Sequence, residues 1–192
     1  SRPWNRFTIR LRDAHGAIVR GYEGNWRDIF QNWEALARSY PAFLPAMVAV
    51  FLDASTADGY NPYRITRDGI DWEVEDPRDP WSHIGYWGDH QIVYLHRLLE
   101  LLERHEPGRL AASLGERRHA YADVPYRIRG FDAIAADPRR TIVFDHERDA
   151  ALREARRTIG ADGSRRRGPD GEVTLVTLAE KLLRSEEHTS EL

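Results

Sequence analysis

The sequence contains no cysteine, a single methionine and a single lysine, Lys181, among its 192 residues. Without cysteine the chain has no disulfides, no thiolate zinc sites and no cysteine nucleophiles. It also lacks a run of about 18 apolar residues and a charged segment that leads into an apolar stretch, so we expect neither a transmembrane helix nor a secretory signal. The cytoplasm is favoured over secretion, and the compartment of a longer parent protein stays open.

Basic charge is not in excess either, because 28 Lys and Arg face 31 Asp and Glu, for a net charge of −3. Binding to a nucleic acid backbone needs a basic face, so the sequence disfavours a nucleic acid partner. Hydrophobic residues make up 41% and charged residues 31% of the chain. That balance is typical of a soluble globular protein, and the length fits one domain or a piece of a larger one.

The last nine residues, Arg184–Leu192, read as the in-frame translation of a common sequencing adapter. We therefore expect the natural chain to break off after Leu183 and treat residues 184–192 as a non-native tail. The alternative is a genuine polar end of a helix.

Apolar spacing predicts a mainly α-helical protein with long loops and a small β-hairpin. Short strands are expected within residues 6–11 and 141–144, and residues 63–66 and 70–74 are expected to pair around Arg67-Asp68-Gly69. Residues 117–129 are expected to be irregular. The expected helices cover residues 25–40, 43–52, 89–104, 109–114, 131–136, 146–159 and 173–183. The second of them is apolar almost all round, which predicts burial on more than one side.

The loop between the second and third helices is rich in Tyr, Trp and carboxylates. Flat rings with a polar edge, mixed with ionised acceptors, suit a sugar, whose C–H face stacks on a ring while its hydroxyls donate. The alternative is a half-buried loop that uses Tyr and Trp as amphipathic filler. The aromatic residues, which lie within residues 60–94 and so reach into the third helix, are Tyr60, Tyr63, Trp72, Trp81, Tyr86, Trp87 and Tyr94.

Two groups of polar residues stand at predicted helix starts. Arg27, Asp28 and Gln31 share the start of the first helix and could project together, although an Arg-Asp pair is also a common cap. The residues Asp89, His90 and Gln91 precede or open the otherwise apolar third helix, where polar groups must pair or face a cavity. His90 could serve as a general acid or base, as an anion contact or as a structural hydrogen-bonding group.

Other chemistry finds little support in the sequence. His83, His90 and His96 lack the tight spacing of metal ligands, so no metal site is predicted. No phosphate-binding glycine loop, dinucleotide motif or nucleophile elbow occurs, so no cofactor is predicted. The run Arg165-Arg166-Arg167 reads as a solvated surface segment.

The segments Asn25-Trp26-Arg27-Asp28-Ile29-Phe30-Gln31-Asn32 and Gly88-Asp89-His90-Gln91-Ile92-Val93-Tyr94-Leu95 resemble inner-helix motifs of the cellobiose and chitobiose phosphorylase family. Residues 59–66 and 84–91 also resemble segments of a group of large uncharacterised bacterial proteins related to that family. The likeness covers residues 20–145. It implies that residues 1–183 are part of an (α/α)₆ barrel whose active site is formed by loops at one end of the inner helices.

The same resemblance implies an enzyme that cleaves a glycosidic bond with inversion, using water or inorganic phosphate. Arg27 and Asp28 would then hold sugar hydroxyls, and Gln31, Trp72, Trp87, Asp89, His90 and Gln91 are the further candidates for binding an oligosaccharide or glycoside. The family's general acid lies in a Trp-Asn-Asp segment that this sequence lacks, so we expect the chain alone to be inactive without the remainder of the barrel.

Two alternatives belong to other functional classes. The first is a non-catalytic carbohydrate-binding or scaffold domain that keeps the helical barrel. The second is a helical interaction module, in which Trp72, Trp81 and Trp87 would face a protein partner.

Overall fold

The computed structural model of the chain describes residues 7–12, 14–59, 61–62, 64–66, 69–72, 78, 91–138, 140 and 142–190. This described part is mainly helical, as predicted. None of its helices is long and apolar enough to cross a membrane. The helices are α1 (Trp26–Ser39), α2 (Leu44–Asp53), α3 (Gln91–His105), α4 (Arg109–Ser113), α5 (Phe131–Ala136), α6 (His146–Ile159) and α7 (Leu178–Ser190), with the 3₁₀ helices η2 (Pro41–Phe43) and η3 (Gly160–Ser164).

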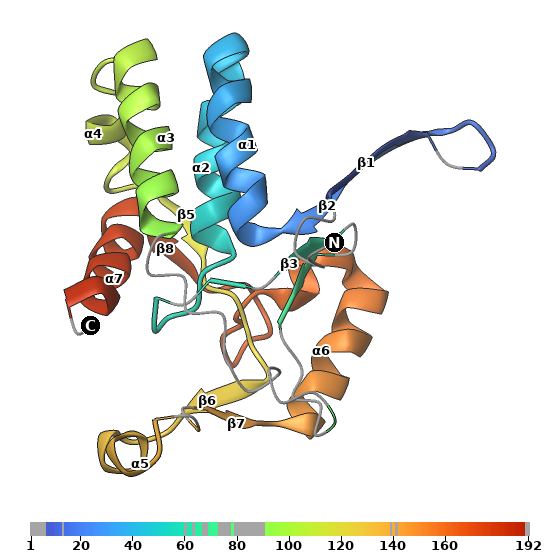
Figure 1. The fold of residues 1–192 in the computed structure, drawn as a ribbon, viewed down its shortest axis with the longest axis vertical. Coiled ribbons are helices and arrows are strands. Elements are labelled where there is room, and N and C mark those ends of the chain that lie inside the picture. The colour runs from blue at the N-terminus through green and yellow to red at the C-terminus, as the bar shows by residue number, and fades with distance from the viewer. Residues whose placement is uncertain are drawn as a thin grey trace.

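Helices α1, α2 and α3 form one packed layer, which Figure 1 shows as neighbouring upright helices. Helices α1 and α3 start at the same end of this layer. Helix α2 runs in the opposite direction, and its C-terminal end lies between those two starts. The ring of Phe30 on α1 meets Phe51 on α2 edge to face, with centroids 4.7 Å apart. The buried core also takes leucines from α3, namely Leu95, Leu98, Leu101 and Leu102.

The predicted burial of α2 on several sides is correct for only part of its surface. Leu44, Met47, Val48, Phe51 and Leu52 are buried against α1 and α3. A second face of the helix, which carries alanines and Val50, lines an open pocket instead. Small side chains leave space beside the helix, so the apolar composition of α2 serves both a core and a cavity wall.

Within the described residues, eight short strands make three antiparallel sheets. The first has the order β1-β2-β3-β4, and its hairpin β3–β4 confirms the one predicted near Arg67-Asp68-Gly69. The other two are pairs, β5 with β8 and β6 with β7. The strands are β1 (Phe7–Arg12), β2 (Ile18–Asn25), β3 (Arg64–Thr66), β4 (Gly69–Asp71), β5 (Arg117–Ala120), β6 (Tyr126–Ile128), β7 (Ile142–Phe144) and β8 (Leu175–Thr177).

The prediction of an irregular segment at 117–129 was wrong, because β5 and β6 lie within it. The predicted helix start at Val173 was also wrong, because residues 175–177 form β8. Helix α7 starts at Leu178, where Thr177 and Glu180 cap it reciprocally: Thr177 N donates to Glu180 Oε2 at 2.6 Å, and Glu180 N donates to Thr177 Oγ1 at 3.1 Å. This capping box fixes the first turn of the helix. Helix α7 includes residues 184–190 of the adapter-like tail.

The remaining helix predictions agree closely with the structure. Helix α6 spans the predicted residues, with Asp145 accepting a hydrogen bond from Arg148 N at its start and Gly160 at φ 75° at its end. A positive φ favours glycine at a helix end, since it has no Cβ. On α3, His96 is exposed and does not belong to the apolar face. The buried stripe passes through Leu95, Leu98 and Leu102 instead.

Candidate functional site

Three of the predicted polar residues, Arg27, Asp28 and Gln91, stand at two neighbouring helix starts. Arg27 and Asp28 lie in the first turn of α1, and Gln91 is the first residue of α3. These starts lie at the same end of the helical layer (Figure 1). The side chain of Gln31, one turn into α1, is exposed. Unpaired N–H groups at helix starts favour partners with negative charge or lone pairs.

The strand pairing of the first sheet places Trp72 near this end of the molecule. Residues Asn25, Arg64 and Asp71 pair in one row across β2, β3 and β4. Neighbouring strands lie about 4.8 Å apart, so Asp71, which precedes Trp72, is about 10 Å from Asn25, which precedes α1. The indole of Trp72 is half-buried and meets the ring of Tyr126 edge to face at 5.2 Å. Its Nε1 is buried without a hydrogen-bond partner in the described part of the chain.

Three predicted residues, Trp87, Asp89 and His90, lie outside the described residues. Of the predicted set, the structure therefore brings the backbone of Arg27, Asp28 and Gln91 to one end of the layer, with Trp72 on the adjoining sheet.

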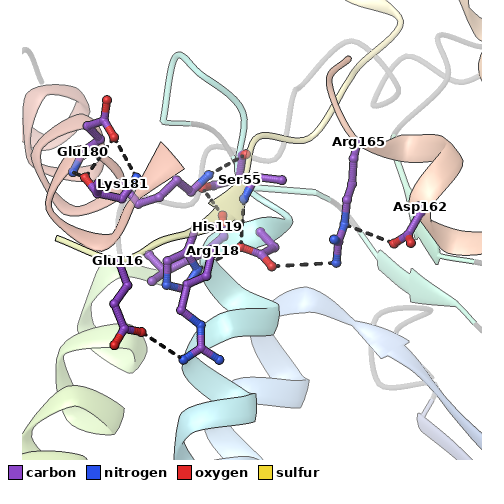
Figure 2. Close-up of polar contacts among 12 residues, drawn as sticks. Ser55, Glu116, Arg118, His119, Asp162, Arg165, Glu180 and Lys181 are labelled. Atoms are coloured by element: carbon purple, nitrogen blue, oxygen red, sulfur yellow. Dashed lines mark hydrogen bonds and ion pairs between the residues drawn. The ribbon is translucent and has the colours of Figure 1, made fainter. Parts of the chain in front are cut away.

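A polar cluster that the sequence did not predict lies at the C-terminal end of α2. Asp53 Oδ1 is 3.0 Å from His119 Nδ1 and accepts a hydrogen bond from Ala120 N at 3.2 Å. On its other side, Asp53 Oδ2 is 3.8 Å from a terminal nitrogen of Arg165, which is beyond hydrogen-bond length. Arg165 Nε is held by Asp162 at 3.3 Å. Figure 2 shows Arg165 reaching toward Asp162 beside the strand that carries His119.

Lys181, the only lysine of the sequence, lies next to this cluster. Lys181 is 1% exposed, and its Nζ donates to the Ser55 carbonyl oxygen at 3.1 Å (Figure 2). The same nitrogen lies 4.0 Å from the ring centroid of Tyr121, which is a cation–π geometry. Burial lowers the pKa of Lys181 to about 7, and the charge of Asp53 partly opposes that shift. Burial likewise raises the pKa of Tyr121, against the nearby charge of Arg184.

Asp53 lines a pocket of about 880 Å³ that runs along α2. One wall is the small-residue face of α2, and the facing wall comes from β3, β4 and η3. Three arginines and three carboxylates stand around it. The polar lining residues are Asp53, Glu106, Arg109, Arg118, Asp162, Ser164 and Arg165.

Sequence reasoning missed Asp53, His119, Ser164 and Lys181, and it interpreted Arg165 as part of a solvated run. That interpretation is wrong for Arg165, which is half-buried between two carboxylates. A single Asp, His or Lys carries no spacing signal, because its partners come from segments 66 or more residues away, as His119 and Lys181 do. The one available signal was the uniqueness of Lys181 in a chain that otherwise uses Arg.

A search against protein-family models and a search of curated proteins both find no match to the chain. Function is therefore inferred from the residues and their geometry.

Proposed function

We propose that the chain is part of an (α/α)₆ catalytic domain that binds an oligosaccharide or glycoside and cleaves its glycosidic bond with inversion, using water or inorganic phosphate. The substrate lies across the starts of α1 and α3. The rest of the barrel, which supplies the general acid, comes from the parent protein.

The observation that carries this proposal is the shared end of α1 and α3. In an (α/α)₆ barrel the inner helices run parallel, with outer helices returning between them, and loops at one end bind the substrate. Helices α1, α2 and α3 alternate in direction, and Arg27 and Asp28 lie in the first turn of α1 while Gln91 is the first residue of α3.

The residue types at these starts suit sugar hydroxyls. The guanidinium of Arg27 offers several donors in a planar fork, and the carboxylate of Asp28 accepts hydrogen bonds from hydroxyls. Inversion needs an acid for the leaving oxygen and a base or phosphate for the attack from the opposite face. Arg27 and Asp28 would therefore orient the sugar, while groups outside this chain protonate the leaving oxygen.

Binding by the 192-residue chain tests the proposal without requiring turnover. Isothermal titration calorimetry with cellobiose and chitobiose, each with and without inorganic phosphate, measures the affinity of the wild type and of Asp28→Ala. Losing hydrogen bonds to a charged acceptor costs about 1.5–3 kcal/mol, so the affinity should fall by roughly 10- to 150-fold. An unchanged affinity in Asp28→Ala would remove Asp28 from the site.

Glu34→Gln is the matched control. Glu34 lies on the same helix, and its carboxylate pairs with Arg38 at 3.0 Å on the surface. An exposed pair of this kind contributes little, so sugar affinity should stay at the wild-type value. In the parent protein, sugar release and phosphate consumption then separate the two reactions, and binding without any turnover there would favour the non-catalytic carbohydrate-binding domain.

A further inference from the structure

We infer that the pocket along α2 is a second binding site, which takes a neutral ligand with hydroxyl groups at one end and an apolar body at the other. The hydroxyls lie between Asp53 and Arg165, and the apolar body lies against the small residues of α2. This inference does not rest on the function proposed above, because it uses neither the start of α1 nor the start of α3.

The apolar wall follows from the periodicity of η2 and α2. Ala42, Ala46, Ala49 and Val50 recur at spacings of three and four residues and so share one face. Because three of the four are alanines, the wall stays recessed. Ile65 and Ile70, a cross-strand pair of β3 and β4, line the pocket as well. The volume of about 880 Å³ lies within the range of known ligand pockets, about 300–1,000 Å³.

The polar end has hydrogen-bonding capacity that the described protein leaves unused. Asp53 Oδ1 is fixed by His119 and by Ala120 N, but Oδ2 accepts no hydrogen bond from a described residue. The gap of 3.8 Å between Oδ2 and Arg165 is too long for a direct hydrogen bond. A ligand hydroxyl can bridge it, since a hydroxyl accepts from a guanidinium and donates to a carboxylate.

Two further features hold this end ready for a ligand. Asp162 holds Arg165 Nε at 3.3 Å, so the guanidinium is oriented before any ligand binds. The buried residue Ser164 lines the same pocket, and its hydroxyl can both donate and accept a hydrogen bond there. Pre-ordered donors and acceptors reduce the entropy lost on binding.

The charges around the pocket favour a neutral ligand over an ionic one. Glu106 pairs with Arg109, and Arg165 lies between Asp53 and Asp162. Three arginines and three carboxylates line the cavity, so its formal charge cancels. An anionic or cationic ligand group would displace an existing ion pair and would gain no net opposite charge.

The test is nuclear magnetic resonance titration of the 192-residue chain with hexyl β-D-glucoside, compared with 1-hexanol and hexyl sulfate. The glucoside should bind at least tenfold more tightly than either, and the shifted amides should cluster at Asp53, Ser164 and Arg165. Shifts confined to the starts of α1 and α3 would overturn this inference while supporting the proposed sugar site. Equal affinity for hexanol would overturn the role of the hydroxyls, and tighter binding of hexyl sulfate would overturn the preference for a neutral ligand.

Ala46→Leu blocks the apolar wall without touching the polar end. It should weaken binding of the glucoside at least tenfold, whereas the matched control Ala151→Leu, an exposed alanine on α6, should leave it unchanged. Asp53→Asn should reduce the affinity toward that of hexanol, and Ala46→Leu keeps the test decisive if Asp53→Asn does not fold. Wild-type affinity in Ala46→Leu, or no binding of the glucoside to the folded wild type, would overturn the inference.

Discussion

The buried amine of Lys181 should make the stability of the chain depend on pH in a window where surface lysines do not titrate. The pKa of Lys181 is lowered from 10.5 to about 7 because its Nζ is removed from water. Between these values the unfolded chain binds a proton that the folded chain has released. The free energy of unfolding therefore rises with pH from about 7 to about 10.5. Below about pH 7 both states bind the proton, so Lys181 adds no pH dependence there.

The size of the effect follows from the shift. One pKa unit corresponds to 1.36 kcal/mol, so the slope approaches about 1.4 kcal/mol per pH unit within the window. Between about pH 7.5 and 9.5 the free energy of unfolding should rise by about 2 kcal/mol on account of Lys181 alone. The raised pKa of Tyr121 acts above this range, so it does not mask the rise.

Urea denaturation of the wild type and of Lys181→Met over this range measures the effect, because methionine has a similar shape and does not titrate. The difference between the two chains should change by about 2 kcal/mol. Lys181→Arg, which stays charged throughout, should also lack the rise while being less stable than the wild type at high pH. A difference between wild type and Lys181→Met that does not change with pH would refute the reasoning.

Since Lys181 is the only lysine, ¹³C-lysine labelling gives one ε-carbon signal, whose titration reports this pKa directly. A midpoint near 10.5 would show that the amine is not desolvated in the folded chain.

Three further substitutions test the packing. Phe30→Ala should lower the free energy of unfolding by about 3–5 kcal/mol, because the ring is fully buried and a cavity remains; a loss below about 1 kcal/mol in denaturant would contradict its place in the core. Gly163→Ala should destabilise the chain because a Cβ there would lie 2.5 Å from backbone atoms of α6, whereas Gly115→Ala meets nothing within 4 Å and should shift the melting temperature little. His119→Leu should cost about 1–3 kcal/mol because it leaves Asp53 with fewer donors, and wild-type stability would show that this contact contributes nothing.

The helices of this protein were largely predictable because their signals are local. Apolar spacing and prolines located α1 and α2, and Gly160 marked the end of α6. Strands β5 and β8 were not predicted because each has three or four residues and its stability comes from a partner far along the chain, as in the pair Arg117 with Thr177. A short strand of this kind has too few residues to show an alternating pattern.

The residues considered for binding show the same difference between local signals and partners that are distant in the sequence. The sequence placed Arg27, Asp28 and Gln91 at helix starts because they belong to long helices whose starts it predicts, and their part in binding stays a prediction. The cluster around Asp53 was missed because its residues come from four segments, α2, β5, the η3 region and α7. No pattern within one of these segments predicts that the others lie beside it. Arg165 shows this most clearly, since its two neighbouring arginines suggest a surface run while its own guanidinium lies between Asp53 and Asp162.

The direction of the three packed helices explains why polar chemistry collects at one end of the layer. Because α2 runs opposite to α1 and α3, its C-terminus lies at the same end as their starts (Figure 1). A helix C-terminus carries partial negative charge and favours hydrogen-bond donors and positive charge, and the Arg165 guanidinium, the His119 ring and Ala120 N surround Asp53 there. Helix starts carry partial positive charge and favour anionic side chains such as Asp28. One alternating helical layer thus places two polar environments of opposite dipole sign at the same end: the starts of α1 and α3, and the C-terminus of α2, where Asp53 lies close to Arg165.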